Sequence, residues 1–371
     1  MSSEKYSFLS RPLETRKSEG NLRKLDTVTG LSDFSSNDYL GLSRDLALSE
    51  KIMERALREG PLANGGTGSR LLSGNHRHYV ALEKKLATLF QAEGSLVFNS
   101  GYAANQALIA AVAQKGDTIL YDQLAHVCIK EGAWLSKADS FSYLHNNLAD
   151  LERRLIHAQG NVFVVTETVF SMDGDFAPID ETLSLCEKYG AHLIVDEAHS
   201  TGVYGHGGSG WLVQEALHDR VFARVYTFGK AMGVHGACVS GSQRLIDYLV
   251  NFARGFIYTT SLPPHSILSI DEAFNYLADH SELPEKLHQN IAFFRSQVAG
   301  AGSQTSIQPI MVAGNDQAKA TANALKEKGL DVRPILSPTV KRGTERLRIS
   351  LHAHNTHSEI RQLCNALEQM G

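Results

Sequence analysis

Short apolar runs alternate with helix-length segments through much of this 371-residue chain, and this alternation limits the folds that it can adopt. Four such runs, 117–121, 162–165, 193–195 and 224–227, have the length of buried strands, and 179–189 has the length of a helix. Buried strands that alternate with helices are typical of a mostly parallel sheet with helices on both faces. The pattern therefore predicts an α/β fold.

The chain is too long for one small core, so we expect two domains. The order of expected helices and strands changes near residue 275, which predicts that a second domain begins there. We expect an N-terminal arm over 1–44, a large domain over 45–275 and a smaller α+β domain over 276–371. In the smaller domain the sequence predicts helices near 283–298 and 318–328, strands at 306–312 and 346–351, and a last helix with the apolar stripe Ile360, Leu363, Leu367 and Met370.

The composition argues against several classes of protein. Hydrophobic residues make up 43% of the chain and charged residues 20%, which is typical of globular proteins. The net charge of -4, without a basic stripe, makes nucleic acid an unexpected partner. We see no signal region in 1–17 and expect no membrane span. Widely separated cysteines favour a reducing, cytoplasmic setting: Cys128, Cys186, Cys238 and Cys364.

Three charged residues, Glu167, Asp196 and Lys230, fall at or just after expected strand ends. In open α/β sheets, ligands bind beyond the carboxyl ends of the strands. Lys230 stands in a tight turn between Gly229 and Gly233, where glycine allows a close approach of a cofactor. A lone lysine is most often a solvated surface residue. In this setting the lysine amine is suited to hold pyridoxal 5'-phosphate (PLP) as an imine and to act later as a base.

Asp196 and His199 complete the prediction of a PLP site. An aspartate paired with the ring nitrogen of PLP keeps that nitrogen protonated. His199 is placed to reach the ring's phenolic oxygen, and Ser171 to do so from the neighbouring strand end. A lone aspartate after a strand more often caps a helix or a turn. The Asp-x-x-His unit together with Lys230 favours the catalytic interpretation.

A phosphate-binding segment is expected at residues 99–105, which follow a strand and open a small-residue helix. Backbone amides at a helix start bind anions, so Gly101 and Tyr102 are candidates, and Thr227 adds a hydroxyl. His126 is a candidate to stack on the cofactor ring, although a single histidine is more often structural.

Two other patterns in the sequence suggest a different ligand, a dinucleotide or a zinc ion. Residues 205–210 match the G-x-G-x-x-G spacing of dinucleotide-binding loops but lie well past the strand that ends at Asp196, so a glycine-rich loop is the better interpretation. His76, His78, His199 and His206 lack the paired spacing of a zinc site, and we expect no metal. A nicotinamide-binding oxidoreductase and a PLP aminotransferase or altered paralogue stay open as rival functions. Only the oxidoreductase would lack a yellow cofactor.

The chain resembles the α-oxoamine synthases, PLP-dependent acyltransferases of the aspartate aminotransferase fold type I. The resemblance is carried by seven segments in order: 34–42, 101–105, 169–175, 196–199, 227–230, 259–264 and 346–349. It implies that Lys230 is the imine lysine, that Asp196 pairs with the ring nitrogen, and that His199 and Ser171 contact the phenolic oxygen. It also implies that His126 stacks on the ring, that Thr260 contacts the phosphate from a second subunit, and that Asn37 and Arg348 bind substrate. An active site shared in this way implies an obligate homodimer.

Within the family, the segments 166–170, 252–258, 306–310 and 333–340 look most like the biotin-pathway branch, which joins L-alanine to a pimeloyl thioester. The chain departs from that branch at His235, where a small residue is expected, and in its short arm before Phe34. Serine palmitoyltransferase, glycine C-acetyltransferase and 5-aminolevulinate synthase remain alternatives. The acyl carrier, coenzyme A or acyl carrier protein, stays open.

Overall fold

The computed structural model describes residues 6–25, 27, 30–298, 300 and 302–370. By internal packing the chain forms two units. The larger unit consists of Asn37–Ser171 and Asp175–Lys286, and the smaller of Met1–Ser36, Met172–Gly174 and Leu287–Gly371. Residues 1–5, 26, 28 and 29 of the predicted arm lie outside the described residues.

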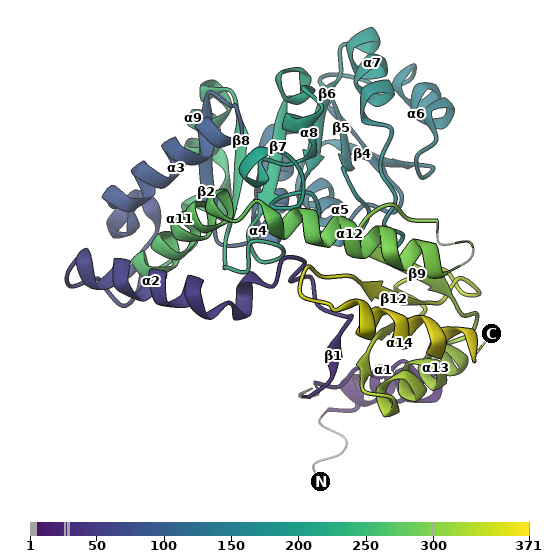
Figure 1. The fold of residues 1–371 in the computed structure, drawn as a ribbon. Coiled ribbons are helices and arrows are strands. Elements are labelled where there is room, and N and C mark those ends of the chain that lie inside the picture. The colour runs from purple at the N-terminus through teal and green to yellow at the C-terminus, as the bar shows by residue number, and fades with distance from the viewer. Residues whose placement is uncertain (1–5, 26, 28–29, 299, 301, 371) are drawn as a thin grey trace. The chain divides into compact units, whose positions relative to one another are not determined.

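A seven-stranded sheet forms the centre of the larger unit (Figure 1). Its strands, in spatial order, are β2 (Gly94–Phe98), β8 (Ala237–Gly241), β7 (Ala223–Thr227), β6 (His192–Asp196), β5 (Val162–Glu167), β3 (Thr118–Asp122) and β4 (Asp139–Tyr143). Strand β8 is antiparallel to both of its neighbours, and the pairings from β7 to β4 are parallel. The prediction of a mostly parallel sheet is confirmed, but β4 and β8 were not among the predicted strands.

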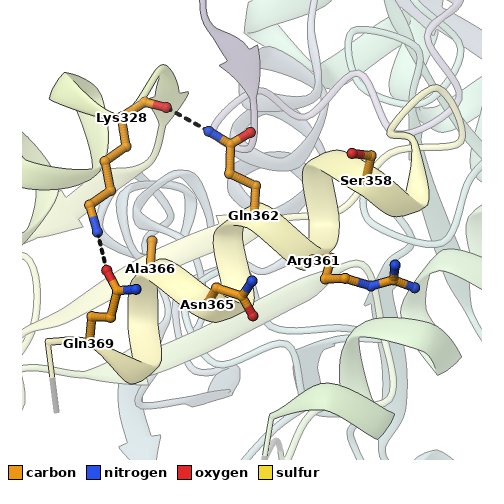
Figure 2. Close-up of a pocket in the computed structure, with 7 residues that line it drawn as sticks. All are labelled: Lys328, Ser358, Arg361, Gln362, Asn365, Ala366 and Gln369. Carbon is orange, nitrogen blue, oxygen red and sulfur yellow. Dashed lines mark hydrogen bonds between the residues drawn. The ribbon is translucent and has the colours of Figure 1, made fainter.

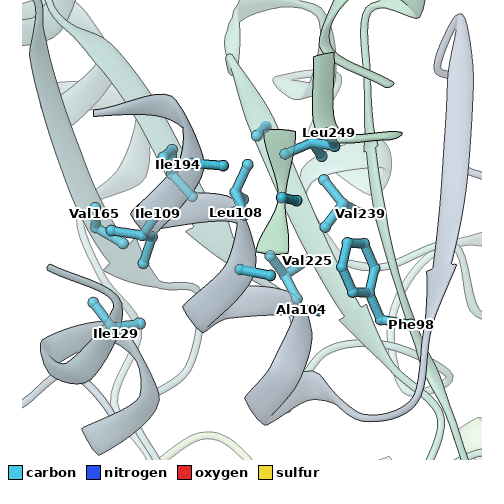
Figure 3. Packing of buried hydrophobic residues seen from close by; sticks show 14 of the residues in the cluster. Phe98, Ala104, Leu108, Ile109, Ile129, Val165, Ile194, Val225, Val239 and Leu249 are labelled. Atoms are coloured by element: carbon cyan, nitrogen blue, oxygen red, sulfur yellow. The ribbon is translucent and has the colours of Figure 1, made fainter. Parts of the chain in front are cut away.

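Helices cover both faces of this sheet because its central strands send apolar side chains to both sides. On β5, Val165 packs with Leu108 and Ile109 of α4 in one core (Figure 3), whereas Val164 packs with Leu183 of α7 in the other. The helices of the larger unit are α2 (Leu46–Arg58), α3 (Arg77–Leu89), α4 (Gly101–Val112), α5 (Val127–Leu135), α6 (Leu148–Leu155), α7 (Ile179–Tyr189), α8 (Trp211–Gln214), α9 (Gln243–Phe252), α10 (Arg254–Ile257) and α11 (Pro264–Asp279).

The smaller unit has its own sheet, in which β12 (Arg346–Ser350) pairs antiparallel with β11 (Arg333–Ile335) and β9 (Ile307–Met311). Its helices are α1 (Ser7–Ser18), α13 (Asn315–Glu327) and α14 (His357–Glu368), together with most of α12 (Glu282–Gln297). The helices and strands predicted after residue 275 are confirmed. Of the predicted final stripe, Ile360 and Leu363 are buried, Leu367 is partly buried, and Met370 lies beyond the end of α14. Thr356 starts α14 with a capping box to Glu359, which fixes where this helix begins.

The N-terminal segment of the chain pairs with a strand from its C-terminal part. Strand β1 (Ser32–Asp33) pairs in parallel with β10 (Leu330–Asp331), and so residues before Asn37 group with the smaller unit. The predicted arm over 1–44 and the predicted domain boundary after residue 275 stay predictions. Among the described residues, no helix is both long and apolar enough to cross a membrane.

Gly233, which follows the Lys230 turn, is expected to tolerate alanine far less than a comparable glycine elsewhere. Its φ is +65°, and a Cβ there would lie 2.3 Å from Ser43 N and 2.5 Å from Leu42 C. Gly190 ends α7 with a φ of +66° but has open space around it. We expect Gly190→Ala to lower the free energy of unfolding by about 1 kcal/mol and Gly233→Ala by about 3 kcal/mol, because only the second adds a backbone clash. Urea unfolding of both variants tests this difference, and equal midpoints would contradict it.

Candidate active site

The carboxyl ends of five parallel strands each lead to a residue with a predicted role. Strand β2 leads to Gly101 and Tyr102, β3 to His126, β5 to Ser171, β6 to Asp196 and His199, and β7 to Thr227 and Lys230. Because parallel strands end at the same edge of a sheet, segments far apart in the sequence meet there.

Lys230 and His199 are in direct contact. The Nζ atom of Lys230 lies 2.8 Å from His199 Nε2, and the hydroxyl of Tyr39 lies 2.7 Å from His199 Nδ1. The Tyr39 hydroxyl donates to Asn37 Oδ1 at 3.1 Å, so it accepts from His199 Nδ1–H. This assignment leaves Nε2 of His199 as the acceptor for Lys230. The contacts therefore join the predicted substrate residue Asn37 to the predicted imine lysine through Tyr39 and His199.

The carboxylate of Asp196 is held by two donors in the protein interior. Asn105 Nδ2 donates to Asp196 Oδ2 at 2.7 Å, and the amide of Ala198 donates to Oδ1 at 2.9 Å. Asn105 lies one turn into α4 and is almost fully buried. These bonds fix the orientation of the carboxylate, as the predicted pairing with a ring nitrogen requires.

The predicted phosphate residues lie at the start of α4. Ser100 caps this helix by accepting a hydrogen bond from the Ala103 amide at 3.2 Å, so Gly101 and Tyr102 stand in its first turn. Amides in a first turn have no partner within the helix and favour an anion. A Cβ on Gly101 would lie 3.0 Å from Thr227 Oγ1. The absence of that Cβ lets the Thr227 hydroxyl approach the helix start.

His126 is the N-cap residue of α5, and its contacts define its ring. Its Nδ1 accepts from the Cys128 amide at 3.3 Å and lies 2.9 Å from Cys128 Sγ. Burial lowers the pKa of His126. Because Nδ1 acts as an acceptor, a neutral ring with its proton on Nε2 fits these contacts. An uncharged, fixed ring of this kind is suited to stacking on a flat cofactor.

Three further residues received roles from the sequence: Ser171, Thr260 and Arg348. Ser171 stands in the turn after β5. Thr260 follows α10, where its carbonyl accepts from Asn99 Nδ2 at 2.8 Å, and it is exposed. Arg348 belongs to β12 of the smaller unit and donates from Nη1 to Ser350 Oγ at 2.9 Å. The roles assigned to these three residues stay predictions.

Glu167, which the sequence placed at a strand end without a role, lies beside Asp196 in the sheet register. Its Oε1 accepts a hydrogen bond of 2.6 Å from the His126 amide. Burial, followed by the charge of Asp196, raises the pKa of Glu167 to about 8. Glu167 therefore holds the backbone of His126.

The raised pKa of Glu167 predicts how stability depends on pH. Below its ordinary pKa, Glu167 is protonated in both the folded and the unfolded chain. As the pH rises toward 8, the unfolded chain loses this proton first, and folding is progressively penalised. We expect the apoprotein of Glu167→Gln to melt above the wild type by about 2–5 °C at pH 8 and by less at pH 5. The exposed Glu54→Gln serves as control, and a difference that does not grow with pH would contradict the prediction.

The sequence assigned no role to Asn105, Tyr39 or Glu167. Asn105 and Tyr39 lie inside segments that carry the family resemblance, 101–105 and 34–42. A polar residue among the small residues of the first turns of α4 is the signal that points to Asn105. The contacts of Tyr39 with His199 depend on a long-range packing that no local pattern carries.

The glycine-rich loop at 205–210 and the start of α8 after it contact a carboxylate of the same chain, that of Glu197. The amides of Trp211 and Leu212, at the start of α8, donate to the Glu197 carboxyl at 2.8 and 3.0 Å. A Cβ on Gly210 would lie 2.2 Å from Glu197 Oε2. The amides that a dinucleotide phosphate would need are therefore already used, which favours the structural interpretation of this loop.

A surface hollow of about 370 Å³ lies along α14 in the smaller unit (Figure 2). Lys328 crosses its rim, donating from Nζ to Gln369 Oε1 at 2.7 Å and accepting at its carbonyl from Gln362 Nε2 at 2.8 Å. None of the residues lining this hollow has a predicted role in the active site.

Comparisons with known proteins agree with the geometry. Residues 29–367 match the family described as aminotransferase class I and II. A putative 8-amino-7-oxononanoate synthase from Bacillus licheniformis is 38% identical, over 98% of this chain and 97% of that protein. A serine palmitoyltransferase from S. paucimobilis with bound PLP–myriocin aldimine has a TM-score of 0.89 at 26% identity, covering 100% of this chain and 98% of that one. An 8-amino-7-oxononanoate synthase from Francisella tularensis has a TM-score of 0.77 at 30% identity, covering 92% and 96%.

Proposed function

Since the chain belongs to the class I and II aminotransferase family, and within it to the α-oxoamine synthases, we propose that it joins L-alanine to a pimeloyl thioester in biotin biosynthesis. It is a PLP-dependent C-acyltransferase. The overall reaction releases carbon dioxide and the carrier thiol and leaves an α-amino ketone. The observation that carries the substrate proposal is the 38% identity, over nearly the whole chain, to a relative named for this product.

The residues at the strand ends fit PLP in charge and shape. The buried carboxylate of Asp196, held by Asn105 and Ala198, suits a protonated ring nitrogen. The start of α4 beside Thr227 suits the phosphate. When bound, PLP supplies an electron sink for the carbanion that forms at the α-carbon of the amino acid.

The chain's own residues divide the remaining work. Lys230 would hold the cofactor through Nζ, and its amine would serve as the base that takes the α-proton of the amino acid. His199 Nε2 lies 2.8 Å from Nζ and would keep this amine in place for the proton transfer. Asn37 and Arg348 are proposed to bind the amino acid's carboxylate, and Ser171 and Thr260 to contact the cofactor. These assignments make the site one of positioned charges and hydrogen bonds.

A matrix of amino acids against thioesters tests the substrate proposal. L-Alanine, glycine and L-serine are each mixed with pimeloyl, acetyl, succinyl and palmitoyl thioesters, carried on coenzyme A or on acyl carrier protein. Thiol release and the mass of the ketone are measured. The highest kcat/KM is expected for L-alanine with a pimeloyl thioester. A preference for another pair would reject this substrate assignment and leave the family intact.

Serine palmitoyltransferase activity is the second candidate, because the S. paucimobilis structure aligns with the whole chain at a TM-score of 0.89. Its 26% identity is lower than the 38% of the Bacillus licheniformis relative, which places the alanine reaction first. The serine and palmitoyl arms of the same matrix separate the two candidates.

We also propose that the enzyme is a cytoplasmic homodimer. The resemblance assigns the phosphate contact of Thr260 to a second subunit, and the Thr260 side chain is exposed in a single chain. Sedimentation of the purified enzyme tests the dimer. A Thr260→Ala subunit mixed with a Lys230→Ala subunit should recover part of the activity, because one of the two sites in the mixed dimer then contains neither change.

A further inference from the structure

A cluster of charged side chains outside the residues with predicted roles lies at the end of β3. His145 stands between two carboxylates: its Nδ1 is 2.9 Å from Asp122 Oδ1, and its Nε2 is 2.8 Å from Asp175 Oδ2. Ionised carboxylates only accept hydrogen bonds, so both ring nitrogens donate and the ring is an imidazolium. Burial lowers the pKa of His145, but its bonds to Asp122 and Asp175 outweigh burial and raise that pKa to about 10. His145 is therefore charged at neutral pH.

The first carboxylate fixes the turn that leads to His126. Asp122 is fully buried, and its Oδ1 also accepts from the Leu124 amide at 2.8 Å. The Ala125 amide donates to the Asp122 carbonyl at 2.9 Å. Asp122 thus holds the two residues that precede His126, and Glu167 holds the amide of His126 itself.

The second carboxylate belongs to the segment that closes the turn containing Ser171. The Asp175 carbonyl accepts from the Phe170 amide at 3.0 Å, and Val169 and Phe176 form a bridge beside it. The His145 ring packs edge-on against the Phe170 ring, with centroids 4.4 Å apart.

Asn146 donates hydrogen bonds to the same two carboxylates as His145. Its amide donates to Asp122 Oδ2 at 2.9 Å, and its side chain donates to Asp175 Oδ2 at 2.7 Å. Its φ of +50° is unusual for a residue other than glycine, and these bonds stabilise it. His145 and Asn146 therefore act as one connection between the turn after β3 and the turn after β5.

We propose that His145 is a positioning residue for the cofactor: bound to Asp122 and Asp175, it holds the turns of His126 and Ser171 at a fixed separation. Because His126 would stack on the PLP ring and Ser171 would contact its phenolic oxygen, a change in the separation of these turns would change the orientation of the ring. The inference rests on the proposed PLP site and on none of the substrate assignments. It matters for rate because a displacement on the order of 1 Å in a reacting group costs about 100-fold.

The test compares His145→Gln with His157→Gln, a change at an exposed histidine. Each apoprotein is titrated with PLP, and the affinity, the circular dichroism of the bound cofactor's visible band, kcat and the amino-acid KM are measured. We expect His145→Gln to weaken PLP binding about 10-fold, to lower kcat about 10- to 100-fold and to change the dichroism, with KM nearly unchanged. The dichroism reports the orientation of the ring, which a purely structural role would not change in a folded protein. His157→Gln should match the wild type.

Equal PLP affinity and equal dichroism in the two variants would overturn the proposal. If His145→Gln does not fold, Asp175→Asn takes its place, because that carboxylate is partly exposed and its replacement weakens the bonds of His145 and Asn146 to the turn after β5. An unchanged visible band in folded Asp175→Asn would then overturn the proposal. A wild type that binds no PLP rejects the cofactor assignment and this inference together. A wild type that binds PLP but prefers other substrates rejects the substrate assignment alone.

Discussion

Lys230→Ala is expected to lower turnover by at least about 10⁴-fold, because it removes both the cofactor's covalent attachment and the base for the α-proton. Lys230 Nζ lies 2.8 Å from His199 Nε2, and Asp196, His199, Thr227 and Lys230 all lie at or just after the ends of neighbouring parallel strands of the seven-stranded sheet. Borohydride reduction followed by peptide mapping should find PLP on Lys230 in the wild type. The variant should have no reducible attachment.

The exposed Lys137→Ala is the matched control and should keep both turnover and the reducible bond. A reducible bond that persists at a different lysine in the Lys230→Ala protein would refute the assignment of Lys230. Because the variant still contains Asp196 and the start of α4, it should bind PLP reversibly. Dialysis should therefore remove the cofactor from the variant and not from the wild type.

Asp196→Asn is expected to lower kcat by about 10²- to 10³-fold. The substitution keeps the size of the side chain and removes the charge that favours a protonated ring nitrogen. The Asn105 amide would then face an amide in place of a carboxylate, so the contact of 2.7 Å would lose most of its strength. Steady-state kinetics and the visible spectrum of the bound cofactor measure the effect.

A PLP analogue methylated at the ring nitrogen separates the charge of Asp196 from its shape. The ring nitrogen of this analogue carries a permanent positive charge and needs no carboxylate to keep it. The analogue should therefore restore part of the activity of Asp196→Asn and none of the activity of Lys230→Ala. Asp219→Asn, a change at an exposed carboxylate, should behave as the wild type. Full activity of Asp196→Asn with ordinary PLP would contradict the proposed role.

The parts of the site that lie at the ends of local patterns could be predicted from the sequence. Lys230 and Asp196 each follow an apolar run, and a parallel sheet brings such ends to one edge. The roles that depend on long-range packing could not be predicted in this way. Tyr39 reaches His199 over 160 positions of sequence, and no period or spacing carries that information.

The missed strands have a similar explanation. Strand β8 is fully buried and short, and it runs against its neighbours, so nothing local distinguishes it from a loop with apolar residues. Strand β4 lies at the sheet edge and is largely exposed, which removes the apolar run that identified the others. The early helix α1 includes Pro12 and exposed apolar residues, so its helical pattern is weak.

The reversal at β8 determines how far the amine of Lys230 can travel. The turn between β7 and β8 is closed at its base by the Phe228 amide on the Gly236 carbonyl and again by the Val234 amide on the Phe228 carbonyl. Because these hydrogen bonds hold both ends of the turn next to paired strands, the backbone of the turn cannot move outward in the way that a mobile loop does. The Lys230 amine can therefore move only through rotations of its four methylene groups. The substrate amino acid has to approach an amine whose backbone position is fixed.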